Sequence, residues 1–368
     1  MTLVNGTEEL SVVVTADPPL PPDVPRRVVT RSFDDRMSWL GSMVGAAAIV
    51  WLVYQLSGWS GKLGFVLLWF AVYLVVYAGI TALGHPWPAV VDRLAGAVVA
   101  GGAAVVLLAL ASTIEYTVVK GWPAYHHVSN FFTQDMAGVR PTAPLDQGGI
   151  LHAILGSGIE VGIALVFSLP LGLGTAVYMT EVGGRLSRVV RTVVEAMTAL
   201  PDVLAGLFVY VVLVLGLGFQ RTGFVAAVAL AVTMTPIVAR SAEVALRVVP
   251  GGLREASLAL GASQASTVWR VVLPTAKAGL ATSLILGIAR IAGETAPLLI
   301  VSGASTYTNL DPFREPMNSL PLYIFSAVRS GQPAFIARGF GAATVLLLLV
   351  SVLFALARYL ARPKRGSR

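Results

Sequence analysis

Long apolar segments alternate with shorter polar stretches along most of the chain. Eight of them are long enough to cross the hydrocarbon core of a bilayer, which takes about 20 helical residues. They cover residues 38–57, 63–83, 94–117, 153–178, 192–215, 223–240, 276–302 and 337–359. The pattern predicts an all-α polytopic membrane protein with about eight transmembrane helices.

The composition agrees with this prediction and excludes several kinds of chemistry. Hydrophobic residues make up 56% of the chain and charged residues 12%, whereas about 25% of a soluble domain is charged. The absence of cysteine excludes disulfides, thiolate catalysis and cysteine-based metal sites. His126 and His127 are adjacent and cannot converge on one metal ion. No phosphate-cradling G-x-x-x-x-G-K-[ST] loop occurs, so we expect no cofactor in this chain.

The positive charges predict how the chain is oriented. An even number of spans puts both termini on one side, and eighteen of the 26 lysines and arginines fall on that side against seven on the other. This asymmetry predicts cytoplasmic termini. The net charge of +7 therefore reports topology and contacts with membrane lipid, and it does not indicate a nucleic-acid partner.

The cytoplasmic loop between the sixth and seventh spans has a distinctive pattern. A short helix over Arg254–Leu260 would expose Glu255, and Gly261 can adopt the left-handed conformation that ends a helix. A second helix would run from about Ala265 to Leu273, where Pro274 interrupts it. A short helix with small residues and a charged rim fits a groove on a partner protein. The alternative is an ordinary solvated amphipathic helix.

The seventh span carries two charges, Arg290 and Glu294, four residues apart and so on one helical face. A lone charge at mid-bilayer costs about 2.5–3.5 kcal/mol even on insertion scales, so such residues are functional candidates. The pair is either a structural bridge or an oxyanion site. In an oxyanion site the arginine presents its planar fork of donors. The glutamate would then hold the arginine when the path is empty and accept a hydrogen bond from a protonated oxyanion, which favours hydrogenphosphate over sulfate.

The fifth predicted span, 192–215, carries the acidic residues Glu195 and Asp202. Asp202 is either a second polar element of the path or a residue at the membrane edge, and the sequence favours the edge. Glu195 is expected to pair with Arg191 at i, i+4.

Two motifs resemble those of a known family. The loop is similar to the EAA signature of ABC importer permeases, with Ser257 and Val271 as mild departures. Residues Ala289–Leu299 and Pro316–Pro321 resemble PstA-type permeases of phosphate ABC importers. The resemblance covers about 94–360 and implies a six-helix permease core preceded by two extra N-terminal helices. It implies a substrate path at Arg290, Glu294 and Thr295, and an ATPase dock at Glu255, Ala256, Ser257, Gly261, Leu273 and Pro274.

The expected organisation and function follow from the resemblance. We expect a disordered tail over 1–36, the extra helix pair over 37–90, a permease domain over 91–360 with its coupling loop at 241–275, and a basic tail over 361–368. The chain would not be an enzyme but would translocate inorganic phosphate across the plasma (inner) membrane of a bacterium by alternating access. The family implies an ATPase dimer carrying ATP and Mg²⁺, a PstC-type permease as heterodimer partner, and an extracellular phosphate-binding protein. Alternatives are a permease for sulfate or molybdate or, less plausibly, a secondary transporter.

Overall fold

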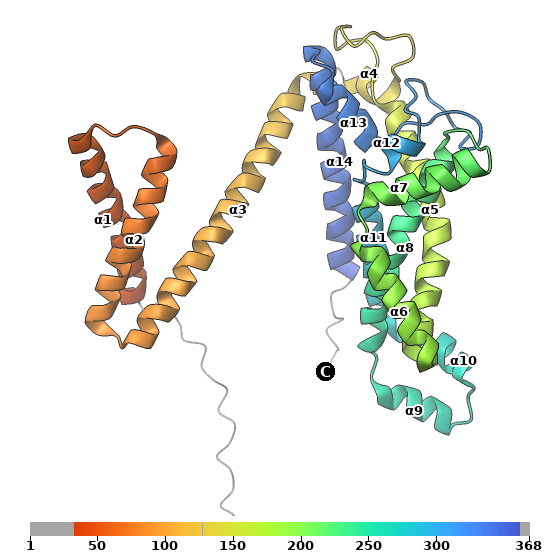
Figure 1. Cartoon of the computed structure of the whole chain (residues 1–368), viewed down its shortest axis with the longest axis horizontal. Helices are drawn as coiled ribbons and strands as arrows, with labels where there is room; N and C mark the ends of the chain where they lie inside the picture. The colour runs from red at the N-terminus through yellow and green to blue at the C-terminus, as the bar shows by residue number, and fades with distance from the viewer. Residues whose placement is uncertain (1–32, 127, 361–368) are drawn as a thin grey trace, which may run out of the picture. The chain divides into compact units, whose positions relative to one another are not determined.

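The computed structural model describes residues 33–126 and 128–360, which are mostly helical and divide after Leu108 into two compact units (Figure 1). The predicted tails over 1–36 and 361–368 lie outside the described residues, except that Phe33–Arg36 form the first turn of a helix. Between them the helices are α1 (Phe33–Ser57), α2 (Lys62–Gly84), α3 (Trp87–Tyr125), α4 (Val128–Thr133), α5 (Leu151–Val177), η1 (Tyr178–Val182), α6 (Gly184–Ala199), α7 (Asp202–Val209), η2 (Tyr210–Gly216), α8 (Gly223–Arg247), α9 (Gly251–Ala259), α10 (Gln264–Thr267), η3 (Val268–Val272), α11 (Leu273–Ile291), α12 (Leu298–Val301), α13 (Leu320–Arg329) and α14 (Pro333–Leu360).

The first unit holds the hairpin of α1 and α2 and the beginning of α3. The short turn of the hairpin requires positive φ, which Gly58 (66°) and Gly61 (122°) supply without a steric penalty. Tyr73 and Tyr77 are buried against α1, and the Trp69 indole donates a hydrogen bond to the Met43 carbonyl at 3.0 Å. The extra helices therefore pack as a defined hairpin.

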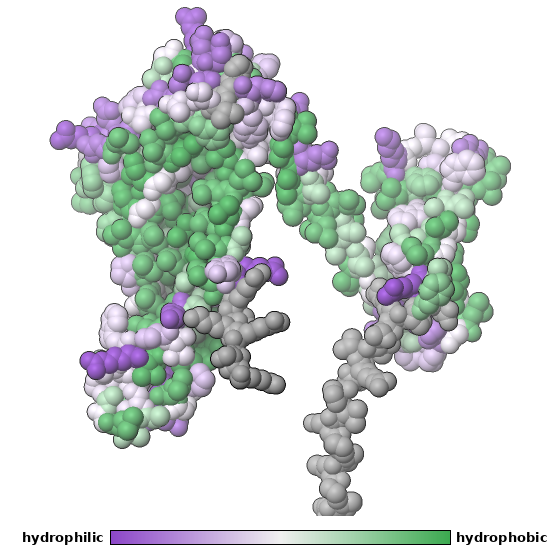
Figure 2. Space-filling model, turned by 180° about the vertical axis from the view of Figure 1, so that it is seen from behind, coloured by the Kyte–Doolittle hydropathy of each residue, from purple (hydrophilic) through white to green (hydrophobic). Residues whose placement is uncertain are grey.

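The second unit is centred on α8, whose inward positions are small or aliphatic. An ideal Cβ built on Gly172 of α5 would lie 2.8 Å from Val238 Cγ1 of α8, so only glycine permits this approach. Small residues at a crossing bring membrane helices into close contact. Figure 2 shows the resulting surface, on which an apolar belt separates polar residues at the two ends of this unit.

Seven of the described helices are long and apolar enough to span a membrane, and a bent pair makes an eighth only if it counts as one span. The pair consists of Gly184–Ala199 and Asp202–Gly216, bent by 102°. The prediction of one helix over 192–215 is therefore wrong. Leu200 is extended (φ −71°, ψ 135°), as expected before a proline, and Pro201 offers no N–H to continue the helix.

The predicted span 276–302 also differs from the structure. The helical path starts earlier, at Gln264, and α11 ends at Ile291, followed by an irregular turn and the short α12. Gly293 and Pro297 lie in this turn. Glycine lowers helix stability and proline cannot donate the required hydrogen bond, which explains the early end.

The loop between α4 and α5 is hydrogen-bonded to the loop between α12 and α13. The Met136 amide donates to the Thr306 carbonyl at 2.9 Å, and the Thr308 amide and hydroxyl donate to the Asp135 carboxylate at 2.8 and 2.9 Å. Burial alone would raise the pKa of Asp135. The two hydrogen bonds from Thr308 and one from the Ala137 amide outweigh this effect and lower the pKa. The loops therefore have fixed structure.

Candidate functional site

The membrane charge pair lies at the end of α11. Arg290 occupies the last turn, and Glu294 follows in the turn beyond it, where its amide donates to the Ile291 carbonyl at 3.0 Å. The Arg290 guanidinium donates from Nη1 to Glu294 Oε1. The predicted contact is present even though the helix ends between the two residues.

A third charged residue joins this pair from α7. Arg290 Nη2 lies 3.2 Å from Asp202 Oδ2, across 88 positions of sequence. This contact supports the interpretation of Asp202 as a second polar element beside Arg290. The side chain of Glu294 is 10% exposed, that of Asp202 33% and that of Arg290 54%, so the arginine is only partly covered by its carboxylates.

Arg290 and Asp202 open onto a cavity of about 170 Å³. The kink between α6 and α7 and the middle of α8 supply its walls, which are lined by Met197, Thr198, Leu200, Ala205, Val232, Thr233, Pro236 and Ile237. Pockets for drug-sized ligands measure about 300–1,000 Å³, so this cavity suits a small ion. Of the three predicted path residues only Arg290 lines this cavity, whereas Glu294 and Thr295 do not.

The predicted docking helix is present as α9. Glu255 and Ala256 are exposed on it, and Ser257 is half-buried, with its hydroxyl 2.9 Å from that of Thr267. Gly261 follows with φ +84°, the left-handed conformation expected of it. The roles of these residues stay predictions, because the geometry shows only which of them a partner can reach.

Arg254 connects this helix to the turn η1, which follows α5 on the side that the predicted topology makes cytoplasmic. Its guanidinium forms two bonds with Glu181 of η1, at 3.0 and 2.8 Å, and donates to the carbonyls of Val249 and Leu246 at 2.7 and 3.0 Å. Bidentate pairs of this kind fix orientation as well as proximity. Sequence reasoning missed this anchor, since Glu181 lies 73 positions away.

The prediction that Pro274 interrupts the helix is wrong. The chain is helical from Gln264 to Ile291, with the π-helical turn η3 directly before Leu273 and Pro274 in the first turn of α11. A π turn inserts an extra residue in the helix and accommodates the missing N–H of proline. An unbroken helical path therefore connects the docking loop with Arg290.

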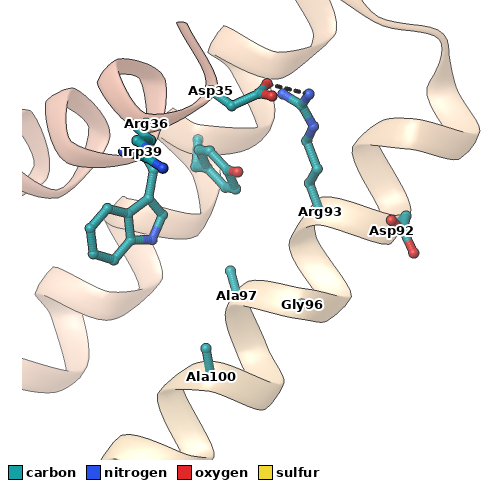
Figure 3. A pocket seen from close by; sticks show the side chains of 9 residues that line it. Asp35, Arg36, Trp39, Asp92, Arg93, Gly96, Ala97 and Ala100 are labelled. Carbon is teal, nitrogen blue, oxygen red and sulfur yellow. Dashed lines mark hydrogen bonds and ion pairs between the residues drawn. The ribbon is translucent and has the colours of Figure 1, made fainter. Parts of the chain in front are cut away.

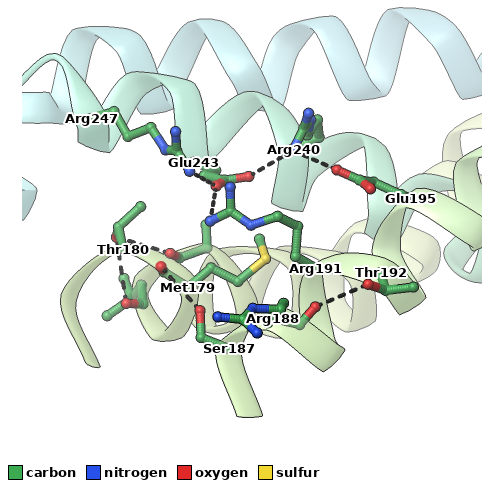
Figure 4. A network of polar contacts seen from close by, with 12 residues as sticks. Met179, Thr180, Ser187, Arg188, Arg191, Thr192, Glu195, Arg240, Glu243 and Arg247 are labelled. Carbon is green, nitrogen blue, oxygen red and sulfur yellow. Dashed lines mark hydrogen bonds and ion pairs between the residues drawn. The ribbon is translucent and has the colours of Figure 1, made fainter. Parts of the chain in front are cut away.

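Glu243 of α8 forms ion pairs with three arginines, at the end of α8 that the predicted topology places on the cytoplasmic side (Figure 4). Its carboxylate lies 2.7 Å from both Arg191 and Arg247 and 3.2 Å from Arg240, and its side chain is 2% exposed. The predicted pair of Glu195 with Arg191 is wrong. Glu195 instead contacts Arg240, at 3.4 Å, because the buried Glu243 draws Arg191 from α6 to α8. The spacing of Arg240 and Arg247 around Glu243 was the available sequence signal.

Comparison with known proteins identifies the family. Residues 168–366, more than half of the chain, match the family model described as "Binding-protein-dependent transport system inner membrane component". The phosphate transport system permease protein PstA 1 of Mycobacterium tuberculosis strain H37Rv is 39% identical over 265 residues, which cover 71% of this chain and 85% of that protein.

Two further relatives carry similar names. The permease protein PstA of Mycobacterium leprae is 38% identical and covers 67% of this chain and 81% of its own length. That of Xylella fastidiosa strain 9a5c is 36% identical and covers 57% of this chain and 74% of its own length. Taken with the helical fold and the docking helix, these matches show that the chain belongs to the binding-protein-dependent transport system inner membrane components, as a PstA-type permease.

Proposed function

We propose that this permease subunit passes inorganic phosphate through the membrane, and that Arg290 is the anion site on its path. The observation that carries the proposal is a partly exposed arginine between two carboxylates at a small cavity within the spanning helices. The names of the relatives support phosphate as the cargo.

The two carboxylates suit a site that must release its cargo. Without an anion, the two carboxylates of Glu294 and Asp202 more than balance the charge of the Arg290 guanidinium and hold it in place. An entering phosphate competes for the same donors, so it is bound weakly and for a short time. A proton on hydrogenphosphate can be donated to Glu294 or Asp202, whereas sulfate has no such proton near neutral pH and meets repulsion from both.

The remaining partners belong to the same proposal. Glu255 and Ala256, which are exposed on α9, would face an ATPase subunit. Two such ATPase subunits would form a dimer that binds ATP and Mg²⁺. A PstC-type permease would complete the path as a heterodimer, and an extracellular phosphate-binding protein would deliver the cargo. The charge asymmetry supports cytoplasmic termini. ATP binding then moves α9 and, through the helix Gln264–Ile291, changes the side to which Arg290 is open.

Uptake of labelled phosphate in cells lacking the chain tests this proposal. The wild-type chain should restore uptake, with arsenate competing and excess sulfate without effect. Arg290→Gln should abolish uptake, and Arg290→Lys should recover only a small part of it, because lysine lacks the planar fork. Arg314→Gln is the matched control, since Arg314 lies in a loop with an 85% exposed side chain.

Two outcomes would contradict the proposal. Normal uptake by Arg290→Gln would remove the anion-site role of this arginine. If the chain restored uptake of sulfate or molybdate but not of phosphate, it would be a permease for those oxyanions and phosphate would not be its cargo.

A further inference from the structure

The extra N-terminal hairpin and the beginning of α3 line a cavity of about 360 Å³ (Figure 3). This volume falls in the range of pockets that hold small organic ligands. Its lining comes from all three helices and consists of Asp35, Arg36, Trp39, Tyr77, Asp92, Arg93, Gly96, Ala97 and Ala100. None of these residues belongs to the phosphate path or the docking helix.

One end of the cavity is charged with both signs. Arg93 Nη2 binds Asp35 at 2.5 Å and lies 3.0 Å from His85 Nε2, which leaves Nε and Nη1 of Arg93 without a partner among the described residues. Arg36 and Asp92 form no ion pair with any described residue. Guanidinium donors and a carboxylate acceptor therefore remain available at the same opening.

The other end of the cavity is apolar. Gly96, Ala97 and Ala100 lie along α3 at helical spacing, and their small side chains leave a slot between Trp39 and the buried Tyr77. Figure 3 shows Arg93 and Asp35 at one end and Ala97 and Ala100 at the other. The polarity of the lining thus changes along the cavity from charged to apolar.

The charged end coincides with the ends of three spanning helices. Arg36 and Trp39 lie in the first turns of α1, α2 ends at Gly84, and Arg93 lies in the second turn of α3. The ends of spanning helices lie in the lipid headgroup layer, where tryptophan is enriched. This placement holds whichever side of the membrane the hairpin ends face.

We infer that this cavity binds one zwitterionic phospholipid with a primary ammonium headgroup, of the phosphatidylethanolamine class. The phosphodiester accepts hydrogen bonds from Arg36 and Arg93, the ammonium donates to Asp92, and an acyl chain lies in the slot over Gly96, Ala97 and Ala100. A lipid matches both ends of the cavity, whereas a soluble anion would leave the slot empty. Phosphatidylglycerol has no cation for Asp92, and phosphatidylcholine has no N–H to donate.

Native mass spectrometry of the full chain in its transporter complex, with each phospholipid added to the detergent, tests the inference. The wild-type complex should retain one phosphatidylethanolamine in preference to phosphatidylglycerol and phosphatidylcholine. Gly96→Leu should fill the slot and reduce retention roughly tenfold, the factor expected when one good contact is lost. No atom lies within 4 Å of a Cβ built on Gly96, so the variant should fold.

Gly102→Leu is the matched control. Gly102 lies on the same helix with equally open surroundings and does not line the cavity. Arg36→Gln should also weaken retention, while Lys62→Gln, at the other end of the hairpin, should not.

Three results would overturn the inference. The first is equal retention of all three phospholipids, and the second is retention at the wild-type level by Gly96→Leu. The third is lipid retention that appears only after removal of residues 1–32, which would mean that this segment and not a lipid occupies the cavity. Because the readout is a bound lipid, it is independent of phosphate uptake, and failure of one proposal leaves the other standing.

Discussion

The two carboxylates beside Arg290 differ in burial, and this difference predicts unequal effects. Glu294 is 10% exposed and contacts Arg290 directly, whereas the Asp202 pair is more open and longer. Exposed pairs contribute about 0–1 kcal/mol, so Asp202→Asn should lower the initial rate of phosphate uptake by no more than about fivefold. Glu294→Gln should lower it by more than about tenfold, since Arg290 loses its nearest anchor. Equal losses, measured per amount of chain in the membrane, would contradict this ranking.

At this scale the sequence predicts contacts only where spacing decides them. Arg290 and Glu294 are four residues apart, and this spacing predicted their contact, which is present although α11 ends between them. The same rule failed for Arg191 and Glu195, because a buried carboxylate on a neighbouring helix attracts Arg191 more strongly. Asp202 reaches Arg290 only through the bend after Leu200, which local spacing does not reveal.

Glu243 of α8 holds α6 through its ion pair with Arg191, so its removal should weaken the packing of α6 against α8. Glu243→Gln would leave Arg191, Arg240 and Arg247 without their shared carboxylate. Breaking a buried pair costs about 3–5 kcal/mol, and partial exposure of the arginines places the loss toward the lower end. We expect a clear drop in the thermal unfolding midpoint of the solubilised complex. Glu195→Gln is the control, since Glu195 is 52% exposed and should change the midpoint little. A similar drop in both variants would refute a special role for Glu243.

Among the helices, prolines explain which predicted boundaries hold. Pro201 follows an extended residue and ends α6, so that one predicted span becomes two helices at 102°. Pro274 directly follows the π turn η3, which accommodates its missing N–H, and the helical path continues through it. Both prolines were visible in the sequence. Their different outcomes depend on the π turn before Pro274, which no residue pattern specifies.

For the whole molecule, the sequence predicted the fold class, the apolar segments and the short helix α9, because each depends on composition or local spacing. It could not predict that the helical path from Gln264 reaches Arg290 without a break, nor that α9 is fastened to η1. Both features concern how movement at one end of the second unit reaches the membrane, and both depend on contacts between distant segments.

Arg254 and Glu255 are neighbours on α9 with opposite surroundings, and this contrast separates docking from coupling. Glu255 is exposed to a partner, so Glu255→Lys should remove the ATPase subunit from a pull-down. Arg254 faces inward to Glu181 and two carbonyls, in bonds worth about 1.5–3 kcal/mol each where a charge takes part. Arg254→Gln should therefore keep the ATPase bound but lower the phosphate transported per ATP hydrolysed in proteoliposomes. Arg185→Gln, an exposed arginine of α6 with no ion pair among the described residues, should leave both quantities unchanged. If Arg254→Gln loses the ATPase as Glu255→Lys does, the arginine supports the dock itself and the transmission role assigned to its anchor is wrong.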